Sequence, residues 1–493
     1  MRLDRLIGCD DGLPLESGGT EICGLTADSR DVAPGFLFAA LPGTKMDGVR
    51  FVPQALEKGA AALLVADDAE LPADLSVTVP IWRSKSPRRD LALAAARFYG
   101  RQPGIVAAVT GTNGKTSVAS FLRQIWGYLG RPAASLGTLG IDTPAGPKPL
   151  GHTTPDPVRL HKALAELADE GVTHLAMEAS SHGLDQFRLD GVNVVAAGYT
   201  NISRDHLDYH PSFEAYFEAK MRLFRDLLDA NGVAVVNVDG ARGRDVVEVA
   251  QDRGLRVMTV GIAGETIRLA EVVPHGAGQR LSLRWGEIER TVELPLMGSF
   301  QAGNALVAAG LAAASGEDPD AILNALEHLN GAPGRMEEVA RAQNGAAIFV
   351  DYAHTPDALE TVLVALRPHC AGRLIVVFGC GGDRDAGKRP LMGGVAAAHA
   401  DIVYVTDDNP RSEDPAPIRA QIMAACPGGI EIGNRAVAIA AAVDRLHAGD
   451  LLLIAGKGHE TGQIIGDRVV PFVDGEVARE AVAGRAPSMR GQA

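Results

Sequence analysis

The stretch "GIVAAVTGTNGKTSVASFLRQIWGYLG" (residues 104–130) joins an apolar run, a glycine-rich turn and an amphipathic segment. The apolar run is typical of a buried strand, and the apolar spacing after the turn is typical of a helix. In the turn, Gly111 and Gly114 precede Lys115 and Thr116. Glycines allow backbone N–H groups to approach phosphate oxygens, and a helix N-terminus adds a favourable partial charge. We therefore predict a strand, a phosphate-binding loop and a helix.

This loop is a candidate site for the phosphates of a nucleotide. Lys115 can reach the β- and γ-phosphates, whereas the Thr116 hydroxyl can ligate Mg²⁺. Val109 stands where the general phosphate-loop pattern has its first glycine, so a plain glycine-rich turn remains the alternative. The residues of the loop that we expect to contact the nucleotide are Gly111, Thr112, Asn113, Gly114, Lys115, Thr116 and Ser117.

The length and composition are those of a soluble multidomain protein. A chain of 493 residues is too long for one hydrophobic core, and a prior of about 150 residues per domain predicts about three domains. No apolar run is long enough to span a membrane, and "MRLDRLIGCDDG" lacks the apolar core of a signal peptide, so we expect a cytoplasmic protein. The formal charge of −14 disfavours nucleic acid as a partner. Phosphorylated ligands stay possible, because local donors hold them.

Cysteine usage argues against disulfides and zinc. The five cysteines are odd in number and show no CxxC spacing, which favours reduced thiols. They are Cys9, Cys23, Cys370, Cys380 and Cys426.

Apolar runs alternate with helical patterns along most of the chain, which predicts an α/β fold. In the N-terminal part, "FLFAAL" and "AALLVAD" read as strands and "FVPQALEKG" as a helix. A glycine- and proline-containing segment, "LNGAPGRMEEV", marks a linker before the C-terminal part. The expected domains are residues 1–95, 96–331 and 332–493, with a central parallel sheet of the P-loop ATPase type and a Rossmann-like C-terminal domain.

Four β-rich runs of the C-terminal part are each followed by a polar, glycine-containing loop. They are "AAIFVDYAHTPD", "RLIVVFGCGGDRD", "DIVYVTDDNPR" and "DLLLIAGKGHE". Ligands of open α/β sheets bind outside the carboxyl ends of the strands, so we expect these loops to form a binding edge. Arg411 of "DDNPR" would lie there; the alternative is that it only bridges Asp408 or Asp414 within its loop.

Three further polar residues stand near the expected strand ends of the central part. Glu178 follows the apolar run "HLAM", where a carboxylate beside a phosphate loop is a natural Mg²⁺ ligand. The alternative for Glu178 is an ordinary glutamate at a helix start. Taken alone, His206 could be structural, as could His210, and Lys220 reads as a solvated helix lysine.

Nine spaced motifs, spread from residue 26 to residue 460, share one likeness. They are "TADSR", "TGTNGKTS", "MEASSHGLDQFRLD", "TNISRDHLDYH", "GAPGRME", "VDYAHTPDAL", "GCGGDRDAGKRPLMG", "DDNPR" and "GKGHE". Through these motifs the chain resembles the Mur ligases of peptidoglycan synthesis. The resemblance implies an N-terminal domain for the UDP-sugar, a central ATPase domain and a C-terminal domain for the incoming amino acid. Within the family, the chain is most similar to the members that add meso-2,6-diaminopimelate.

The resemblance also implies the roles of residues at matching positions. Lys115, Glu178, His206 and Lys220 would be catalytic, with Thr116, Glu178, His206 and a carbamylated Lys220 (N6-carboxylysine) holding Mg²⁺. Further contacts to ATP would come from Asn304, Arg335, Asp351 and His354. The UDP-muramoyl-dipeptide would contact Ala27, Ser29, Thr44, Lys45, Met46, His152, Thr153, Thr154, Ser180, Gln186 and Arg188. Diaminopimelate would contact Arg384, Asp408, Asn409, Pro410, Arg411, Gly456 and Glu460.

Two residues depart from the family pattern. Gln301 stands where asparagine is usual before Asn304, and His152 replaces a common asparagine, which weakens the assignment of His152 relative to Thr153 and Thr154. The resemblance implies ATP-dependent formation of an amide through an acyl phosphate, by a protein that we expect to be a monomer. The alternatives are a lysine-adding Mur ligase, a folylpolyglutamate synthetase-like ligase and a nucleotide-binding regulatory module, which would bind ATP without depending on an amino acid.

Overall fold

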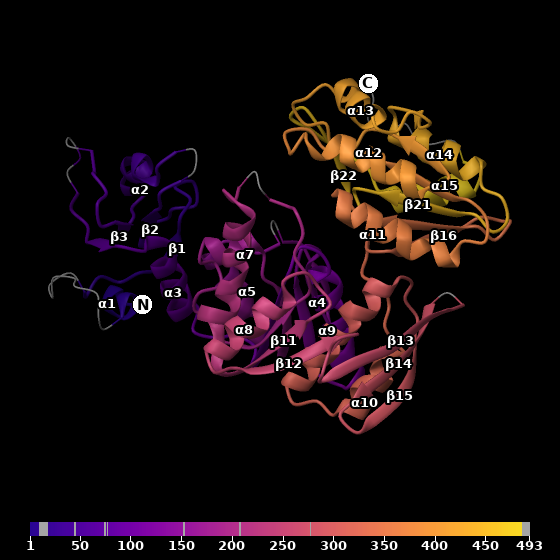
Figure 1. Cartoon of the computed structure of the whole chain (residues 1–493). Coiled ribbons are helices and arrows are strands. Elements are labelled where there is room, and N and C mark those ends of the chain that lie inside the picture. Colours follow the sequence, from indigo (N-terminus) through magenta and orange to yellow (C-terminus); the bar gives the residue numbers. More distant parts are fainter. Residues whose placement is uncertain are drawn as a thin grey trace.

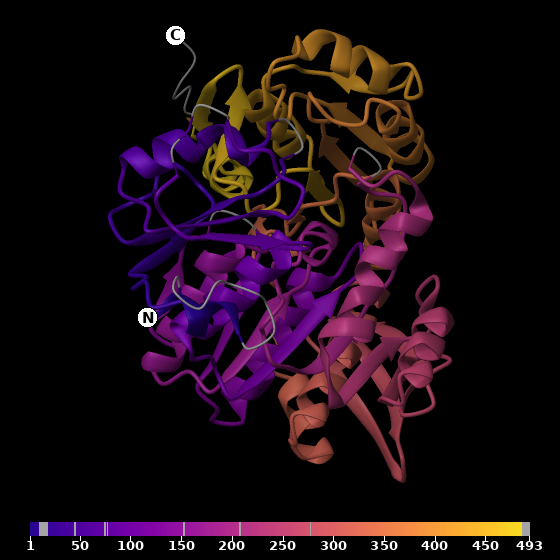
Figure 2. The ribbon, with the colours of Figure 1, turned by 90° about the vertical axis from the view of Figure 1, so that its left-hand side faces the viewer.

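The computed structural model contains three α/β domains that follow one another along the chain (Figure 1). It describes residues 1–8, 18–43, 46–72, 75, 77–150, 153–206, 209–276 and 278–485. Turned by 90°, the ribbon has the C-terminal domain above the central one (Figure 2). The expected α/β class with three domains is confirmed. The expected boundary after residue 95 falls within a helix and the one after residue 331 within a loop, and the boundaries stay predictions.

The N-terminal domain is built on a four-stranded parallel sheet of order β1-β2-β3-β4. One apolar cluster packs α1 and α3 on the sheet, and a second packs α2 on it. The elements are α1 (Leu3–Ile7), β1 (Gly24–Thr26), β2 (Phe36–Ala40), η1 (Gly48–Phe51), α2 (Val52–Glu57), β3 (Ala62–Ala66), β4 (Ile81–Ser84) and α3 (Pro87–Tyr99). The last helix, α3, also packs against α5 of the next domain.

The central domain has an eleven-stranded sheet of order β15-β14-β13-β12-β11-β10-β5-β9-β6-β7-β8. The strands from β13 to β6 run parallel, whereas β14, β15, β7 and β8 add antiparallel edges. Its first elements are β5 (Ile105–Thr110), α4 (Lys115–Tyr128), β6 (Ala133–Gly137), β7 (Gly140–Thr143), β8 (Gly146–Lys148), α5 (Pro157–Asp169), β9 (His174–Glu178), α6 (Ser181–Asp185) and β10 (Val194–Tyr199).

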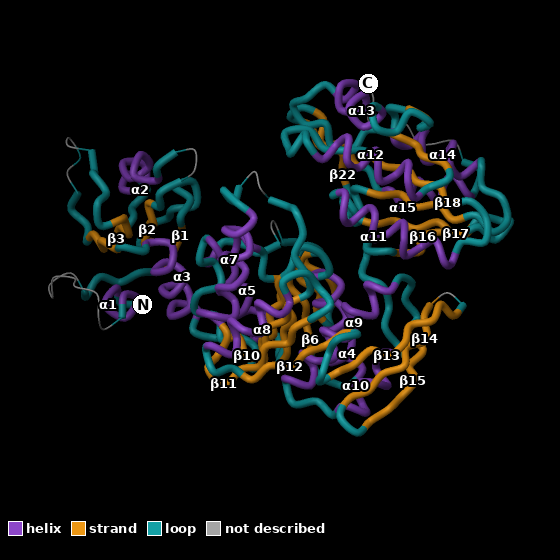
Figure 3. Tube along the Cα trace, in the orientation of Figure 1, coloured by secondary structure: helices purple, strands orange, loops and turns teal. Residues whose placement is uncertain are grey.

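Helices cover both faces of this sheet, α4, α9 and α10 on one face and α5 to α8 on the other (Figure 3). The remaining elements are α7 (Phe213–Arg222), η2 (Leu223–Leu227), β11 (Leu228–Asn237), α8 (Gly243–Asp252), β12 (Arg256–Gly261), β13 (Ile267–His275), β14 (Gly278–Trp285), β15 (Ile288–Leu294), α9 (Ser299–Ala314) and α10 (Pro319–Leu326). The predicted strand, loop and helix of residues 104–130 are β5, its turn and α4. Because β5 lies between β10 and β9, the turn is at the middle of the sheet edge.

The C-terminal domain has a six-stranded sheet of order β16-β17-β21-β18-β19-β20, in which only β16 is antiparallel. Helices α11, α12 and α13 cover one face, and α14 and α15 the other. The four runs expected to be strands are β17, β18, β19 and β21, and their loops lie at one edge. The elements are β16 (Glu337–Arg341), β17 (Ala347–Asp351), α11 (Pro356–Leu366), η3 (Arg367–His369), β18 (Leu374–Phe378), α12 (Lys388–His399), β19 (Ile402–Val405), α13 (Pro415–Met423), β20 (Ile430–Glu431), α14 (Arg435–Asp444), β21 (Leu451–Ala455), β22 (Gly462–Ile465), β23 (Arg468–Pro471) and α15 (Asp474–Val482).

None of the helices described is both long and apolar enough to cross a bilayer. The cysteines that the structure describes are free thiols, namely Cys23, Cys370, Cys380 and Cys426.

A fully buried ion pair joins α14 to α15. Arg435 Nε and Nη2 donate to the two carboxylate oxygens of Asp474, each at 2.7 Å, and Nη2 also donates to the carbonyl of Ala455 at 2.9 Å. Neither side chain is exposed to solvent. Removing one partner of such a pair leaves an uncompensated charge in the core.

We therefore expect Asp474→Ala to lower the free energy of unfolding by about 3–5 kcal/mol. The matched control is Glu289→Ala, which removes a partner of Arg284 at the same 2.7 Å but on the surface, where the side chains are 58% and 69% exposed. This control should lose less than about 1 kcal/mol. Urea unfolding followed by circular dichroism measures both losses, and equal losses would contradict the assigned role of burial.

Candidate active site

A cavity of about 610 Å³ lies where the central domain meets the C-terminal domain. Its walls come from the turn after β5, from the loops after β9 and β10, from α7 and α9, and from the start of the C-terminal domain. Among the residues expected to act in catalysis or to contact ATP, it is lined by Thr112, Asn113, Gly114, Lys115, Thr116, Ser117, Glu178, His206, Lys220, Asn304, Arg335, Asp351 and His354. Thr153 and Ser180, expected to contact the dipeptide, line it too.

The turn after β5 requires its two glycines. Gly111 has a φ of 149° and Gly114 a φ of 89°. A Cβ atom at Gly111 would overlap the Thr200 hydroxyl, and one at Gly114 would overlap the side-chain oxygen of Asn304. The tight approach of Thr200 and Asn304 therefore excludes any side chain at these two positions.

Lys115 begins α4 and folds over the turn. Its Nζ donates to the carbonyls of Gly111 at 2.8 Å and Thr112 at 2.9 Å. Burial lowers the pKa of Lys115, although the Glu178 and Asp205 carboxylates partly oppose that shift. The ammonium is thus held beside the backbone groups that would cradle a phosphate.

Lys220 is buried on α7 and meets the same turn. Its Nζ donates to the Gly111 carbonyl at 2.8 Å and lies 4.4 Å from the centre of the Tyr216 ring. Burial lowers the pKa of Lys220 well below its ordinary value, and the nearby charge of Lys115 lowers it further. Within the described part of the chain, no carboxylate forms an ion pair with Lys220. The expectation of a solvated helix lysine is therefore wrong: this side chain is buried, and burial disfavours its charged form.

Glu178 is the last residue of β9 and is only 1% exposed. Its carboxylate accepts hydrogen bonds from the Thr138 backbone N–H at 2.7 Å and from the Thr138 hydroxyl at 3.1 Å. The Thr138 and Thr153 hydroxyls lie 3.0 Å apart. The position of Glu178 at a strand end is thus as expected, and the helix-start alternative does not apply.

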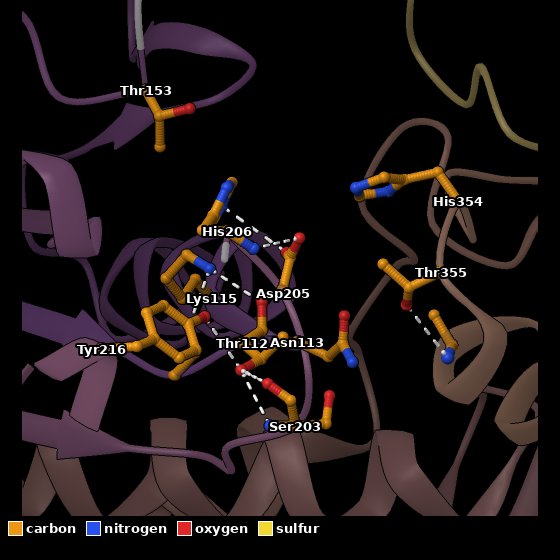
Figure 4. A network of polar contacts seen from close by, with 12 residues as sticks. Thr112, Asn113, Lys115, Thr153, Ser203, Asp205, His206, Tyr216, His354 and Thr355 are labelled. Carbon is orange, nitrogen blue, oxygen red and sulfur yellow. Dashed lines mark hydrogen bonds and ion pairs between the residues drawn. The ribbon is translucent and has the colours of Figure 1, made fainter. Parts of the chain in front are cut away.

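His206 has a positive φ of 54°, which is unusual for a residue with a side chain. Its backbone N–H donates to Asp205 Oδ1 at 2.8 Å, and its Nε2 lies 3.5 Å from Asp205 Oδ2. Burial lowers the pKa of His206 to about 4, so the imidazole is neutral at pH 7. Figure 4 shows Asp205 and His206 beside Lys115, with His354 of the C-terminal domain opposite.

The C-terminal domain closes the cavity with Arg335, whose guanidinium lies 4.2 Å from the centre of the Tyr352 ring. Arg335 Nη2 also donates to the Thr116 hydroxyl at 3.4 Å. Asp351 accepts from the backbone N–H groups of Met336 and Ala353, each at 2.7 Å. Both Asp351 oxygens thus hold the backbone at the start of this domain.

Thr154, Gln186 and Arg188, also expected to hold the dipeptide, form a connected network with Ser180, in which Thr154 precedes α5 and the other three residues follow β9. The Ser180 hydroxyl donates to the Thr154 hydroxyl at 3.0 Å, and the Thr154 hydroxyl donates to the Glu178 carbonyl at 3.0 Å. Arg188 donates to the Thr154 carbonyl at 2.5 Å and to Gln186 Oε1 at 2.8 Å. Gln186 and Arg188 belong to this network but do not line the cavity.

The described residues expected to contact uridine, Ala27, Ser29 and Met46, do not line the cavity. Ser29 is buried and donates to Gln54 Oε1 at 2.8 Å, whereas Ala27 and Met46 are exposed. Thr44, Lys45 and His152 lie outside the described residues.

The residues expected to contact diaminopimelate form a second cluster, on the loops after β18, β19 and β21. Asn409 donates to Glu460 Oε2 at 2.8 Å, and its side-chain oxygen accepts from the buried Lys457 ammonium at 3.2 Å. Lys457 also donates to Glu460 Oε2 at 2.8 Å. Pro410 and Asp408 are buried, Arg384 is exposed, and a Cβ atom at Gly456 would lie 2.7 Å from Asp408 Oδ2.

Arg411 does not bridge the acidic residues of its own loop. Its Nη1 donates to the carbonyls of Gly382 at 2.8 Å and Asn409 at 3.4 Å. Asp414 instead accepts from the backbone N–H of Ala416 at the start of α13, and Asp408 accepts from the N–H of Asn409. The alternative of a loop staple is therefore not supported.

Sequence reasoning missed several residues of these two clusters. Asp205 and Lys457 stand inside motifs that carry the resemblance, so their acidic and basic side chains were a usable signal. Thr138 and Gln463 had no such signal, because nothing local marks a threonine or a glutamine as a partner of a distant loop.

Three family models match the chain. The one described as "Mur ligase family, catalytic domain" matches residues 21–99, "Mur ligase middle domain" matches residues 109–312, and "Mur ligase, glutamate ligase domain" matches residues 334–458.

Curated relatives are similar over nearly the whole chain. The UDP-N-acetylmuramoyl-L-alanyl-D-glutamate–2,6-diaminopimelate ligase of Bradyrhizobium diazoefficiens is 54% identical over 489 residues, which cover 98% of this chain and 100% of the relative. The ligase of the same name from Caulobacter vibrioides is 55% identical over 469 residues, covering 94% and 96%.

Solved structures are similar as well. One of an enzyme with that same name has a TM-score of 0.70 at 34% identity and covers 98% of this chain and 99% of its own. The MurF ligase of Thermotoga maritima in complex with ADP has a TM-score of 0.62 at 19% identity, covering 94% and 96%, and supports the fold alone.

We expect Lys115→Ala to lower the turnover of ATP, because the turn contains no other lysine that could supply a positive charge to the phosphates. The loss should be at least about 3 kcal/mol of transition-state stabilisation, the scale of one preorganised electrostatic group. Phosphate release by the purified variant measures it. Lys162→Ala, on the exposed face of α5, is the control and should keep full activity. Near-wild-type turnover by Lys115→Ala would overturn the phosphate-loop assignment.

Proposed function

The chain belongs to the Mur ligase family, and from this premise we infer that it is an ATP-dependent amide ligase of peptidoglycan synthesis. It adds meso-2,6-diaminopimelate to the D-glutamate γ-carboxylate of UDP-N-acetylmuramoyl-L-alanyl-D-glutamate. The observation that carries this conclusion is the 54% identity to a ligase named for that reaction, over the whole length of that relative. The monomeric state and the cytoplasmic location stay predictions.

In the proposed reaction, the γ-carboxylate attacks the γ-phosphorus of ATP, which gives an acyl phosphate and ADP. The amine of diaminopimelate then adds to the acyl carbon, and phosphate leaves as the amide forms. Phosphoryl transfer of this kind depends mainly on positioning and on cationic groups. Lys115 is the cation at the turn and begins α4, and the N-terminus of a helix adds a favourable partial charge for phosphate.

Contacts between the two domains support a nucleotide held between them. Arg335 of the C-terminal domain reaches Thr116, and Asn113 Nδ2 donates to Asp357 Oδ2 at 3.3 Å. We propose that Asn304, Arg335 and His354 contact the nucleotide, while Asp351 acts by holding the backbone of the Arg335 and Tyr352 segments. Enclosure between two domains keeps water from the acyl phosphate.

The proposed magnesium ligands are Thr116, Glu178, His206 and the carbamate of Lys220. All four residues line the one cavity. The Thr116 hydroxyl, the Glu178 carboxylate and a carbamate supply the oxygen donors that Mg²⁺ prefers, so the residues fit the ion. When bound, magnesium reduces the repulsion between the carboxylate and the triphosphate. The backbone N–H and the hydroxyl of Thr138 both donate to the Glu178 carboxylate and so hold it in place.

The surroundings of Lys220 suit carbamylation. The Lys220 side chain is only 1% exposed, burial disfavours its charged form by lowering its pKa, and its nitrogen donates to the Gly111 carbonyl. An uncharged amine can add to the carbon of CO₂, and loss of a proton from nitrogen then leaves a carbamate. The product carries a negative charge where a protonated lysine would place a second positive charge beside Lys115.

We propose that the muramoyl-dipeptide contacts Thr153, Thr154, Ser180, Gln186 and Arg188, next to Glu178. The uridine end would contact Ala27, Ser29 and Met46 of the N-terminal domain, together with Thr44 and Lys45. Diaminopimelate would bind at the second cluster, where Arg411 and Glu460 present opposite charges after β19 and β21, the two strands that flank β18. Arg384, Asp408, Asn409, Pro410 and Gly456 complete this proposed site.

Lys220→Ala should be nearly inactive, because the carbamate is lost, and added acetate should restore part of the activity by supplying a carboxylate in its place. Product formation with and without acetate measures the rescue. Lys115→Ala is the matched control and should not respond to acetate. Active wild-type enzyme that shows no carbamate signal by ¹³C NMR in ¹³C-bicarbonate would contradict this role.

Arg411→Ala should lose roughly 2–5 kcal/mol in kcat/KM for meso-diaminopimelate, as expected when one member of a buried charge pair is truncated. A planar guanidinium can pair with the distal carboxylate through two parallel hydrogen bonds, and lysine has no such carboxylate. The KM for ATP should change little. Arg468→Ala, on the exposed strand β23, is the control and should behave as wild type.

The same assay tests the proposed function in the wild-type enzyme. Phosphate release is measured from ATP and the UDP-muramoyl-dipeptide with meso-diaminopimelate or with lysine. We expect discrimination on the order of 10⁴ in favour of meso-diaminopimelate, because lysine would leave Arg411 without its carboxylate partner. Comparable rates with the two amino acids would overturn the function stated here.

A further inference from the structure

Arg411 is held in a backbone conformation that disfavours it. Its φ is 54°, in the left-handed region that residues with a Cβ atom rarely adopt. Such a conformation persists where the surrounding structure holds it, and it often marks a functional position. The contacts that hold Arg411 are therefore part of how the site works.

The hairpin β22–β23 binds both backbone polar groups of Arg411. The Arg411 N–H donates to the Ile464 carbonyl at 3.0 Å, and the Gly466 N–H donates to the Arg411 carbonyl at 2.7 Å. Together they form a parallel bridge between Arg411 and Ile465. The strained residue is thus fixed by a segment more than 50 residues further along the chain.

The same strand holds the residues before Arg411. Gln463 is 7% exposed, and its Nε2 donates to the Asp408 carbonyl at 2.6 Å. The Ile464 N–H donates to Asn409 Oδ1 at 2.9 Å. Two of these contacts use side chains, those of Gln463 and Asn409. Because Asn409 also bonds Glu460 and Lys457, Gln463 is the residue that a substitution can change without disturbing the rest of the cluster.

This support determines where the guanidinium points. One of its nitrogens, Nη1, donates to the carbonyls of Gly382 and Asn409, which fixes the plane of the group. Asn409 in turn donates to Glu460. A shift of the Asp408–Arg411 loop would therefore move the cation and the anion of the site relative to each other.

We propose that Gln463 is a positioning residue for the selection of meso-diaminopimelate: through the Asp408 carbonyl it holds the loop in which Arg411 keeps its left-handed backbone, so that the guanidinium meets the distal carboxylate. The inference rests on the proposed function, since it assigns a role in choosing that substrate. Gln463 acts through Arg411 and does not touch the reacting atoms.

The test replaces Gln463 by leucine, which has a similar volume and no donor. The kcat/KM for meso-diaminopimelate should fall about tenfold, the effect of losing one buried hydrogen bond, and a higher KM should carry the loss. The preference over lysine should fall by the same factor, while the KM for ATP stays unchanged. Gln463→Met is measured in parallel, so that the test does not depend on the folding of one variant. Val469→Ala is the control, because Val469 lies on β23 and is 68% exposed. Its kcat/KM for meso-diaminopimelate and its preference over lysine should equal those of the wild type.

A double-variant cycle separates positioning from general support of the fold. In the Arg411→Ala background, Gln463→Leu should change kcat/KM less than twofold, because the residue through which it acts is gone. A tenfold loss in both backgrounds, or wild-type selectivity in folded Gln463→Leu and Gln463→Met, would overturn the inference alone. A wild-type enzyme that does not ligate meso-diaminopimelate would overturn the proposed function and this inference with it.

Discussion

The carbonyl oxygen of Gly111 accepts a hydrogen bond from Lys115 and another from Lys220, each at 2.8 Å. Lys115 and Lys220 are 105 positions apart in the sequence, yet their amines meet at this one atom. The backbone that presents this carbonyl can form only because Gly111 has no side chain. Thr200 fills the space that a Cβ atom would take. Two like charges cannot share such a place at low cost, so the site favours a neutral amine or an anionic adduct at Lys220.

The two clusters of polar residues are built differently. At the cavity, the side chains come from the central sheet, and the C-terminal domain adds a few half-buried polar contacts such as that of Arg335 with Thr116. Contacts of this kind are weak individually, which suits domains that must admit and release a nucleotide. At the second cluster, Asn409, Lys457 and Glu460 are bonded within one domain, and the hairpin β22–β23 holds the loop from outside. In the proposed function, activation of the carboxylate would thus take place between domains, and selection of the amino acid within one.

The sequence predicted those parts of the fold that depend on local pattern. The run into Gly111–Ser117 and the strand ends at Glu178 and Arg411 were readable, because periodicity and turn residues act within a few positions. Taken alone, Lys220 was misread, since nothing in "YFEAK" reports that α7 is buried against the turn after β5. Thr138 and Gln463 could not be found either, because their roles arise from contacts 40 and 55 residues away in sequence. For Lys220, the role that the family resemblance implies stays a prediction.

The buried pair of Arg435 and Asp474 has a consequence for how this chain can change over evolutionary time. Each side chain is tolerated in the core only in the presence of the other, whereas two apolar residues of similar volume could replace both with little loss. Any path made of single substitutions from the charged pair to an apolar pair passes through a chain with an isolated core charge. The pair is thus an epistatic barrier: two neighbouring solutions of similar stability are separated by an intermediate that folds poorly, and a lineage holding one of them tends to keep it.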